Sequence, residues 1–210
     1  MSIIQVEPNH YFDISYDSKE RMISYWYQIN EIRSLNTKNV LEVGLGNGFL
    51  SNYLKVRKIN VVTIDIDKRL NPDISSSVVN LPFINEIFDT VVSFEVLEHI
   101  PYDDAKLALS EMFRVSRKYV ILSIPDCTHI CRFSIPIPKM GMLNRLVPLP
   151  HRPKQNIFNG EHYWEIGKRD FPLSRLVNDI KDIGFEVIST YRIFENPYHR
   201  FFILKKLKEN

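Results

Sequence analysis

The chain has 210 residues, of which 44% are apolar and 25% are charged, and its formal net charge is +2. This is long enough for one globular domain with a full core and too short for two ordinary ones, so residues 1–210 are predicted to form a single domain. The small net charge does not indicate a duplex-binding protein, because such proteins usually have a strong basic bias. No apolar run approaches the roughly 20 residues of a transmembrane helix.

Residues 1–35 are predicted to form an N-terminal helical cover. The first residues lack the basic and apolar regions of a secretory signal, so we expect a cytoplasmic protein. Asp17 or Ser18 can cap a helix that packs on one edge of a sheet, and apolar residues follow at helical spacing, namely Met22, Ile23, Trp26, Tyr27 and Ile29. We also expect Tyr11, Tyr16 and Trp26 to help close a pocket.

The stretch Asn39–Ser51, NVLEVGLGNGFLS, reads as a strand, a glycine turn and the start of a helix. At Gly44, Gly46 and Gly48 the backbone can adopt positive φ angles, and a ligand can approach main-chain N–H groups. The spacing differs from the dinucleotide-binding GxGxxG pattern. In addition, the carboxylate of Glu42 would repel a pyrophosphate and attract an ammonium group.

A second strand is predicted at Asn60–Asp67, and its carboxyl end should lie beside the glycine turn. Asp65 follows Gly44 by about 20 residues, the spacing at which an acidic side chain accepts hydrogen bonds from both hydroxyls of a ribose. Asp67 is read as a helix cap or a solvent-facing residue. We therefore expect a ligand that contains a ribose.

Short strands are predicted at Val78–Val79 and Ile87–Ser93. Distinctive segments lie around them: LPF at 81–83, FDTVVS at 88–93 and EVLEHI at 95–100. Together with the ExGxGxG pattern at 42–48, their order and spacing resemble the type 11 branch of the class I S-adenosylmethionine-dependent methyltransferases. The resemblance implies a Rossmann-like, doubly wound α/β sheet of seven strands in the order 3-2-1-4-5-7-6, with strand 7 antiparallel and helices on both faces.

The resemblance also implies that S-adenosylmethionine is the cofactor. The glycine turn would hold its methionine end, Asp65 its ribose and residues 77–81 its adenine, while Phe94 and Glu95 would flank the methionine portion. The full set implied is Glu42, Gly44, Leu45, Gly46, Gly48, Asp65, Ile66, Ser77, Val78, Leu81, Ser93, Phe94 and Glu95. The family usually has an aspartate where this chain has Ser77, which can still form a hydrogen bond.

The remaining elements continue the alternation of strands and helices. A helix is predicted to start at Pro101–Asp103, followed by a strand at Tyr119–Ile124, a helix that ends at Gly184, and strands at Phe185–Phe194 and His199–Lys206. The last two strands form a hairpin. Its turn contains NPYH at 196–199, similar to the NPPY motif of amino-methylating nucleic-acid enzymes, but that motif follows strand four, so we reject this assignment.

The segment Asp126–Asp170 is too long for an ordinary loop and is predicted to be an inserted lid or acceptor region at the ligand-binding edge. From Arg132 to Lys154 it has basic residues and no acidic one, with apolar residues and prolines between them. The pattern fits a proline-stiffened lid with a solvated basic face. It also fits a site for an anionic or amphiphilic acceptor, such as a sugar phosphate, a glycolipid or a prenyl-type molecule, with peripheral membrane contact through residues 130–154.

Three side chains are candidates for the general base that a hydroxyl acceptor needs: Glu95, His99 and His162. His162 lies in GEHYWEIG at 160–167, where Tyr163 and Trp164 either cover the core or line a pocket around the sulfonium. His99 could equally be a helix-start residue held by the backbone.

The chain has two cysteines, and they lie close together in the segment Cys127-Thr-His129-Ile-Cys131. Structural zinc normally takes four ligands with a different spacing, so we expect no metal there and read the cysteines as reduced thiols.

These observations predict an enzyme that moves a methyl group from S-adenosylmethionine to a small-molecule, sugar or lipid-like acceptor by direct displacement. The alternatives are a non-catalytic binding or scaffold protein of the same fold and an NAD(P)-dependent oxidoreductase, which Glu42 and the glycine spacing disfavour. A nucleic-acid methyltransferase stays open through the basic stretch, although no appended binding module is seen. The acceptor, the atom methylated and the oligomeric state are left open by the sequence.

Overall fold

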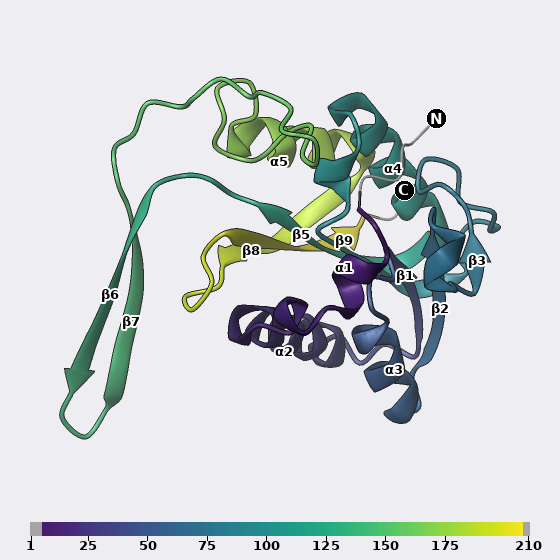
Figure 1. Ribbon diagram of the computed structural model, residues 1–210, viewed down its shortest axis with the longest axis horizontal. Coiled ribbons are helices and arrows are strands. Elements are labelled where there is room, and N and C mark those ends of the chain that lie inside the picture. The colour runs from purple at the N-terminus through teal and green to yellow at the C-terminus, as the bar shows by residue number, and fades with distance from the viewer. Residues whose placement is uncertain (1–5, 208–210) are drawn as a thin grey trace.

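The computed structural model describes residues 6–207, so residues 1–5 of the predicted N-terminal cover, and residues 208–210, lie outside the described part. A seven-stranded sheet runs through the molecule in the order β3-β2-β1-β4-β5-β9-β8 (Figure 1). Its strands are β1 (Asn39–Val43), β2 (Asn60–Asp65), β3 (Ile74–Ser75), β4 (Phe88–Phe94), β5 (Ser116–Pro125), β8 (Phe185–Arg192) and β9 (His199–Lys206). Strand β9 is antiparallel to both β5 and β8. The predicted fold, including the order 3-2-1-4-5-7-6, is confirmed.

Helices cover both faces of the sheet, because its central strands are apolar on both sides. Leu41 of β1 packs in the core under α4 and α5, whereas its neighbour Val40 packs on the other side with residues of α2 and α3. Figure 1 shows these helix pairs on opposite sides of the strands. The helices are α2 (Lys19–Ser34), α3 (Phe49–Val56), α4 (Tyr102–Val115) and α5 (Leu173–Ile183), with short turns at α1 (Asn9–Phe12), η1 (Ile14–Tyr16), η2 (Lys68–Leu70) and η3 (Leu97–His99).

The parallel strands β1, β2 and β4 end side by side, which creates one edge where loops meet. The register pairs Val43 with Ile64 of β2 and with Ser93 of β4. The N–H of Gly44 donates to the carbonyl of Ile64 over 2.9 Å, so the glycine turn starts directly at this edge. Ligands of doubly wound sheets bind at such carboxyl ends.

Helix α2 begins where predicted but buries a different face. The hydroxyl of Ser18 accepts from the N–H of Arg21 over 3.2 Å, as expected of a cap. The buried residues are Ser24, Tyr25, Gln28 and Ile32, whereas Met22 and Trp26 are 37% and 59% exposed. The predicted stripe was wrong at these two positions because the inner side of α2 also forms a polar cavity wall, so polar side chains are buried there.

The third strand lies at Ile74–Ser75 and not at the predicted Val78–Val79, which forms a turn. Thr63 and Asp73 explain the shift. The Asp73 carboxylate accepts from the Thr63 N–H over 2.8 Å, and the Asp73 N–H donates to the Thr63 hydroxyl over 2.9 Å. These bonds bring the chain alongside β2 before Val78 is reached.

The segment 126–170 contains a long antiparallel hairpin of β6 (Ile130–Ile137) and β7 (Gly141–Pro148). Figure 1 shows this hairpin as an arm that extends away from the seven-stranded sheet. The following residues return to the body, where Ile166 forms a bridge with Asp126. The basic and apolar residues of the arm therefore lie outside the domain core. None of the helices described in residues 6–207 is long and apolar enough to cross a membrane.

Candidate active site

A cavity of about 350 Å³ lies at the carboxyl ends of β1, β2 and β4. Its walls gather most of the site residues predicted from the sequence: Glu42, Gly44, Leu45, Gly46, Asp65, Ile66, Ser77, Val78, Phe94, Glu95, His99 and His162. Three predicted residues are not part of its lining. Leu81 and Ser93 are buried in the core and in β4, and Gly48 begins α3 on the far side of the turn.

The glycine turn forms part of the cavity floor and is closely packed. Gly44 has a φ of 86°, and a Cβ added there would lie 2.3 Å from Cγ2 of Val96. Any other residue would therefore clash as well as strain the backbone. A Cβ added at Gly46 would lie 3.7 Å from the ring of Tyr11 and 3.8 Å from the hydroxyl of Tyr16. The N-terminal turns thus lie directly over the glycine turn.

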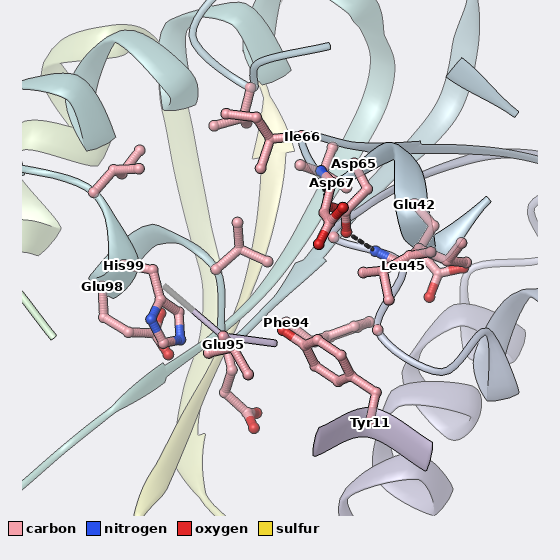
Figure 2. A pocket seen from close by; sticks show the side chains of 18 of the residues that line it. Tyr11, Glu42, Leu45, Asp65, Ile66, Asp67, Phe94, Glu95, Glu98 and His99 are labelled. Carbon is pink, nitrogen blue, oxygen red and sulfur yellow. Dashed lines mark hydrogen bonds between the residues drawn. The ribbon is translucent and has the colours of Figure 1, made fainter. Parts of the chain in front are cut away.

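Asp65 is fixed by main-chain hydrogen bonds. Its carboxylate accepts from the N–H of Leu45 and from the N–H of Asp67, both over 2.8 Å (Figure 2 draws the bond to Leu45). Burial raises the pKa of Asp65 in spite of these bonds. Each oxygen keeps further accepting capacity, so the carboxylate can receive hydroxyl donors in the cavity. Asp67 instead caps η2 and binds Arg69.

Glu42 lies beside the glycine turn as a buried carboxyl. It is only 4% exposed, and its Oε2 has no hydrogen-bond partner among residues 6–207. Burial raises its pKa from 4.5 to about 8. A buried carboxyl without a cation gains most from a positively charged ligand group. This wall of the cavity therefore suits an ammonium group.

The N-terminal segment contributes side chains that sequence reasoning foresaw only in part. Tyr11 and Tyr16 line the cavity as expected, with ring centroids 5.5 Å apart, whereas the exposed Trp26 does not line it. Arg21 was not predicted to take part. Its guanidinium lies 4.5 Å from the centroid of the Tyr16 ring and donates to Glu95 over 2.8 Å.

Glu95 is held by residues from three elements. Its Oε2 accepts from Arg21 of α2 and lies 3.3 Å from Nε2 of His199 at the start of β9, and its Oε1 accepts from the Ser123 hydroxyl over 2.7 Å. Glu95 has a positive φ of 56°. Since its oxygens are engaged by a cation and a hydroxyl, Glu95 is better placed to orient neighbours than to accept a proton.

The hairpin turn between β8 and β9 reaches the same cavity. Tyr198 and His199 line it, and the Tyr198 hydroxyl donates to Glu165 over 2.8 Å. The NPYH segment is therefore at the site although the motif assignment was rejected. Its position at a hairpin end was predicted, but the contact of that end with Glu95 depends on β9 pairing with β5.

Glu98, His99 and His162 form a cluster in which one donor atom of each lies within 4.8 Å of the others. The two imidazoles meet edge to face at 4.9 Å. Burial and the neighbouring His162 lower the pKa of His99. The hydrogen bond from His162 lowers the pKa of Glu165 to about 2. Figure 2 shows Glu98 and His99 side by side at one end of the cavity and Asp65 at the other, with Phe94 and Glu95 between the two ends.

Two other predicted features lie outside the cavity. Trp164 is buried in the core and donates from Nε1 to the carbonyl of Leu97 over 3.0 Å, which agrees with the alternative that it covers the core. The Cys127 thiol donates to the carbonyl of Ile166 over 3.1 Å, and both cysteines are free thiols. Within residues 6–207, the group of side chains suited to a metal is the Glu98 cluster and not the cysteine segment.

Comparison with protein families agrees with the sequence resemblance. Residues 41–124 match the family model described as "Methyltransferase domain". This range holds the glycine turn and the segments LPF, FDTVVS and EVLEHI, so the predicted resemblance is confirmed. No curated protein sequence matches the chain.

Several solved structures share the fold. The PH0226 protein from Pyrococcus horikoshii is 12% identical, with a TM-score of 0.63 over 96% of this chain and 100% of that one. A 1,6-didemethyltoxoflavin-N1-methyltransferase from Burkholderia thailandensis, solved with its substrate and S-adenosylhomocysteine, is 12% identical, with a TM-score of 0.62 over 96% and 85%. An S-adenosylmethionine-dependent methyltransferase from Clostridium acetobutylicum is 11% identical, with a TM-score of 0.61 over 95% and 97%.

Proposed function

We propose that this chain, whose residues 41–124 match the methyltransferase domain model, transfers the methyl group of S-adenosylmethionine to a small-molecule, sugar or lipid-like acceptor. One observation carries the proposal. The cavity joins one wall, with the glycine turn, Glu42 and Asp65, to a second wall of imidazoles and carboxyls, and the first wall would suit a nucleoside that carries an amino-acid group. Its volume of about 350 Å³ is within the range of small-molecule sites.

The cofactor-binding roles follow from the chemistry of each wall. Asp65 would accept the ribose hydroxyls, because its carboxylate is already oriented by the N–H groups of Leu45 and Asp67. Glu42 would attract the ammonium group of the methionine end. Ser77 and the N–H of Val78 would meet the adenine, and Ile66 would pack against it. S-adenosylmethionine carries each of these groups.

The reaction is a direct displacement. A lone pair on the acceptor forms a bond to the methyl carbon while the carbon–sulfur bond breaks, and its electron pair stays on sulfur as neutral S-adenosylhomocysteine. The sulfonium is a good leaving group, so the protein mainly has to align the reactants and exclude water. Tyr11 and Tyr16 above the glycine turn would exclude water. His99 or His162 would serve as base, since Glu95 is already engaged by Arg21.

The composition of the arm formed by β6 and β7 supports the proposed class of acceptor. Its basic side chains have no acidic neighbour between residues 132 and 154, and large apolar side chains are exposed on it, with Met140 82% and Met142 58% accessible. The arm does not line the cavity. It would therefore bind the anionic or amphiphilic surroundings of the acceptor, including a membrane surface, and leave recognition of the reacting atom to the cavity.

Calorimetric titration of the purified protein tests the proposal. We expect S-adenosylmethionine and S-adenosylhomocysteine to bind and NADH not to bind. Asp65→Ala should lose binding, while Asp182→Ala, which removes an exposed carboxylate of α5, should keep it. Binding of NADH in place of the adenosyl ligands would favour an oxidoreductase. Binding of S-adenosylmethionine without transfer to any acceptor in a screen of anionic sugars and lipids would favour the scaffold alternative.

A further inference from the structure

We propose that Glu98, His99 and His162 bind a divalent transition-metal ion, at the end of the cavity away from Asp65. The ion would hold an oxygen of the acceptor. Within residues 6–207 no other group of three donor side chains comes as close together. The part of this proposal that concerns the acceptor rests on the proposed methyl transfer, whereas ion binding itself does not.

The geometry of the donor atoms suits an ion. The three donors lie within 4.8 Å of one another. Donors at about 2.1 Å from a tetrahedral ion are roughly 3.4 Å apart, so modest side-chain rotations would bring all three into contact with it. Two imidazoles and one carboxylate are a known donor set of catalytic metal sites, which leave a coordination position open for a substrate.

Both imidazoles are already oriented by acceptors on their Nδ1 atoms. Nδ1 of His99 lies 3.1 Å from the carbonyl oxygen of Glu161, and Nδ1 of His162 lies 2.8 Å from Oε1 of Glu165. A carbonyl or an ionised carboxylate can only accept, so Nδ1 carries the proton in each ring. The lone pair is then on Nε2. A ligand histidine typically has this arrangement, with a carboxylate or carbonyl behind the ring.

Glu98 supplies the second, independent observation. Its side chain is fully buried, and neither Oε1 nor Oε2 has a hydrogen-bond partner among residues 6–207. A buried carboxylate without a partner is strongly unfavourable. The nearby guanidinium of Arg21 is already bound to Glu95. A metal ion would provide the missing partner for Glu98.

The ion would act on an acceptor that has a hydroxyl group. Coordination lowers the pKa of a bound hydroxyl, so its proton passes to the solvent and the oxygen stays on the ion. An oxygen lone pair then forms the bond to the methyl carbon as the carbon–sulfur bond breaks toward sulfur. The histidines would hold the ion in this scheme and would not need to accept the proton. This predicts acceptors that can offer an oxygen to a metal.

Metal titration of the full chain, without any adenosyl ligand, tests the proposal. Binding of Mn²⁺ is followed by the loss of the free-ion signal in electron paramagnetic resonance, and binding of Zn²⁺ by calorimetry. We expect one ion per chain, and at least tenfold weaker binding in Glu98→Gln and in His162→Ala. Glu165→Ala, which removes the acceptor behind His162, should weaken binding by about 10- to 100-fold.

His129→Ala is the matched control. The rings of His129 and His151 form a second close pair of imidazoles, with centroids 5.1 Å apart, and neither ring lines the cavity. This variant should bind metal like the unmodified protein. The proposal is overturned if the unmodified protein binds neither ion, if Glu98→Gln and His162→Ala bind as well as it does, or if His129→Ala alone loses binding. Thermal melts identify a variant that fails to fold, in which case the other variant decides. Failure of the unmodified protein to bind S-adenosylhomocysteine would contradict the proposed function and the acceptor role of the ion, and it would leave ion binding itself standing.

Discussion

Replacing Glu42 by glutamine should change how the stability of the protein depends on pH. The pKa of this buried carboxyl is about 8 in the folded protein and about 4.5 when unfolded. The folded state therefore holds a proton that the unfolded state releases, and the stability of the unmodified protein falls as the pH rises from about 4.5 to about 8. Glutamine cannot ionise, so the variant lacks this loss.

The pKa difference sets the size of the effect. From 4.5 to about 8, at about 1.4 kcal/mol per pH unit, the upper limit is on the order of 5 kcal/mol. The buried amide of glutamine adds a cost of its own, but that cost is independent of pH. The quantity that matters is thus the free energy of unfolding of Glu42→Gln relative to the unmodified protein, compared between pH 5 and pH 9.

Urea unfolding at pH 5, 7 and 9 measures this quantity, without ligand. We expect the variant to gain several kcal/mol relative to the unmodified protein between pH 5 and pH 9. Glu111→Gln is the control, because its hydrogen bond with Arg114 lowers the pKa of Glu111, so its contribution stays constant over this range. Equal stability differences for Glu42→Gln at pH 5 and pH 9 would refute the view that this carboxyl is desolvated.

Three further predictions concern the turn, the ion pair and the arm. Gly44→Ala should abolish binding of S-adenosylhomocysteine and lower the free energy of unfolding by about 1–3 kcal/mol, because its Cβ would overlap Val96. Gly46→Ala should lower it by less, and thermal melts and calorimetry compare the two variants. A double-mutant cycle of Arg21→Ala and Glu95→Gln, followed by urea unfolding, should give a coupling of about 1–2 kcal/mol for this half-buried pair, and a value near zero would contradict its role. Replacing the β6–β7 arm by a short glycine-serine linker should leave S-adenosylhomocysteine binding unchanged but abolish sedimentation with vesicles of anionic phospholipid; equal sedimentation of both proteins would exclude the arm as a membrane contact.

Local sequence patterns were sufficient to predict most strands of the sheet and the glycine turn beside Asp65, whereas the strand order was implied by the family resemblance. The strand, glycine turn and helix at Asn39–Val56 lie within a few residues of one another, and Asp65 follows at the end of the next strand. Hydrophobic period and glycine spacing report such short-range structure directly. The same holds for the final hairpin, whose turn separates two apolar strands.

The opposite wall depends on contacts between distant segments. Arg21 and Glu95 are 74 residues apart, and His199 reaches Glu95 only because β9 pairs with β5. No periodic pattern encodes these contacts. The burial of Glu98 was hidden in the same way, since a glutamate in a short turn ordinarily lies at the surface.

The β6–β7 arm lies in the segment that was predicted to be an inserted lid or acceptor region, because this segment is too long for an ordinary loop and has prolines among its apolar residues. Pro136 and Pro148 are tolerated because a two-stranded hairpin has two open edges, where a missing N–H has no consequence. Sequence reasoning identified the unusual composition of this segment, and the structure shows that the composition belongs to an arm outside the body.

The position of Tyr11 and Tyr16 above Gly46 has a consequence for the speed of the catalytic cycle. Their side chains lie within 4 Å of the position that a Cβ on Gly46 would take, and both line the cavity, so they would cover a nucleoside bound there as proposed. If S-adenosylmethionine binds as proposed, spent cofactor would leave as these turns swing aside. The capped start of α2 at Ser18 is the natural pivot. Exchange of product for fresh cofactor, and not bond making, would then set the turnover rate.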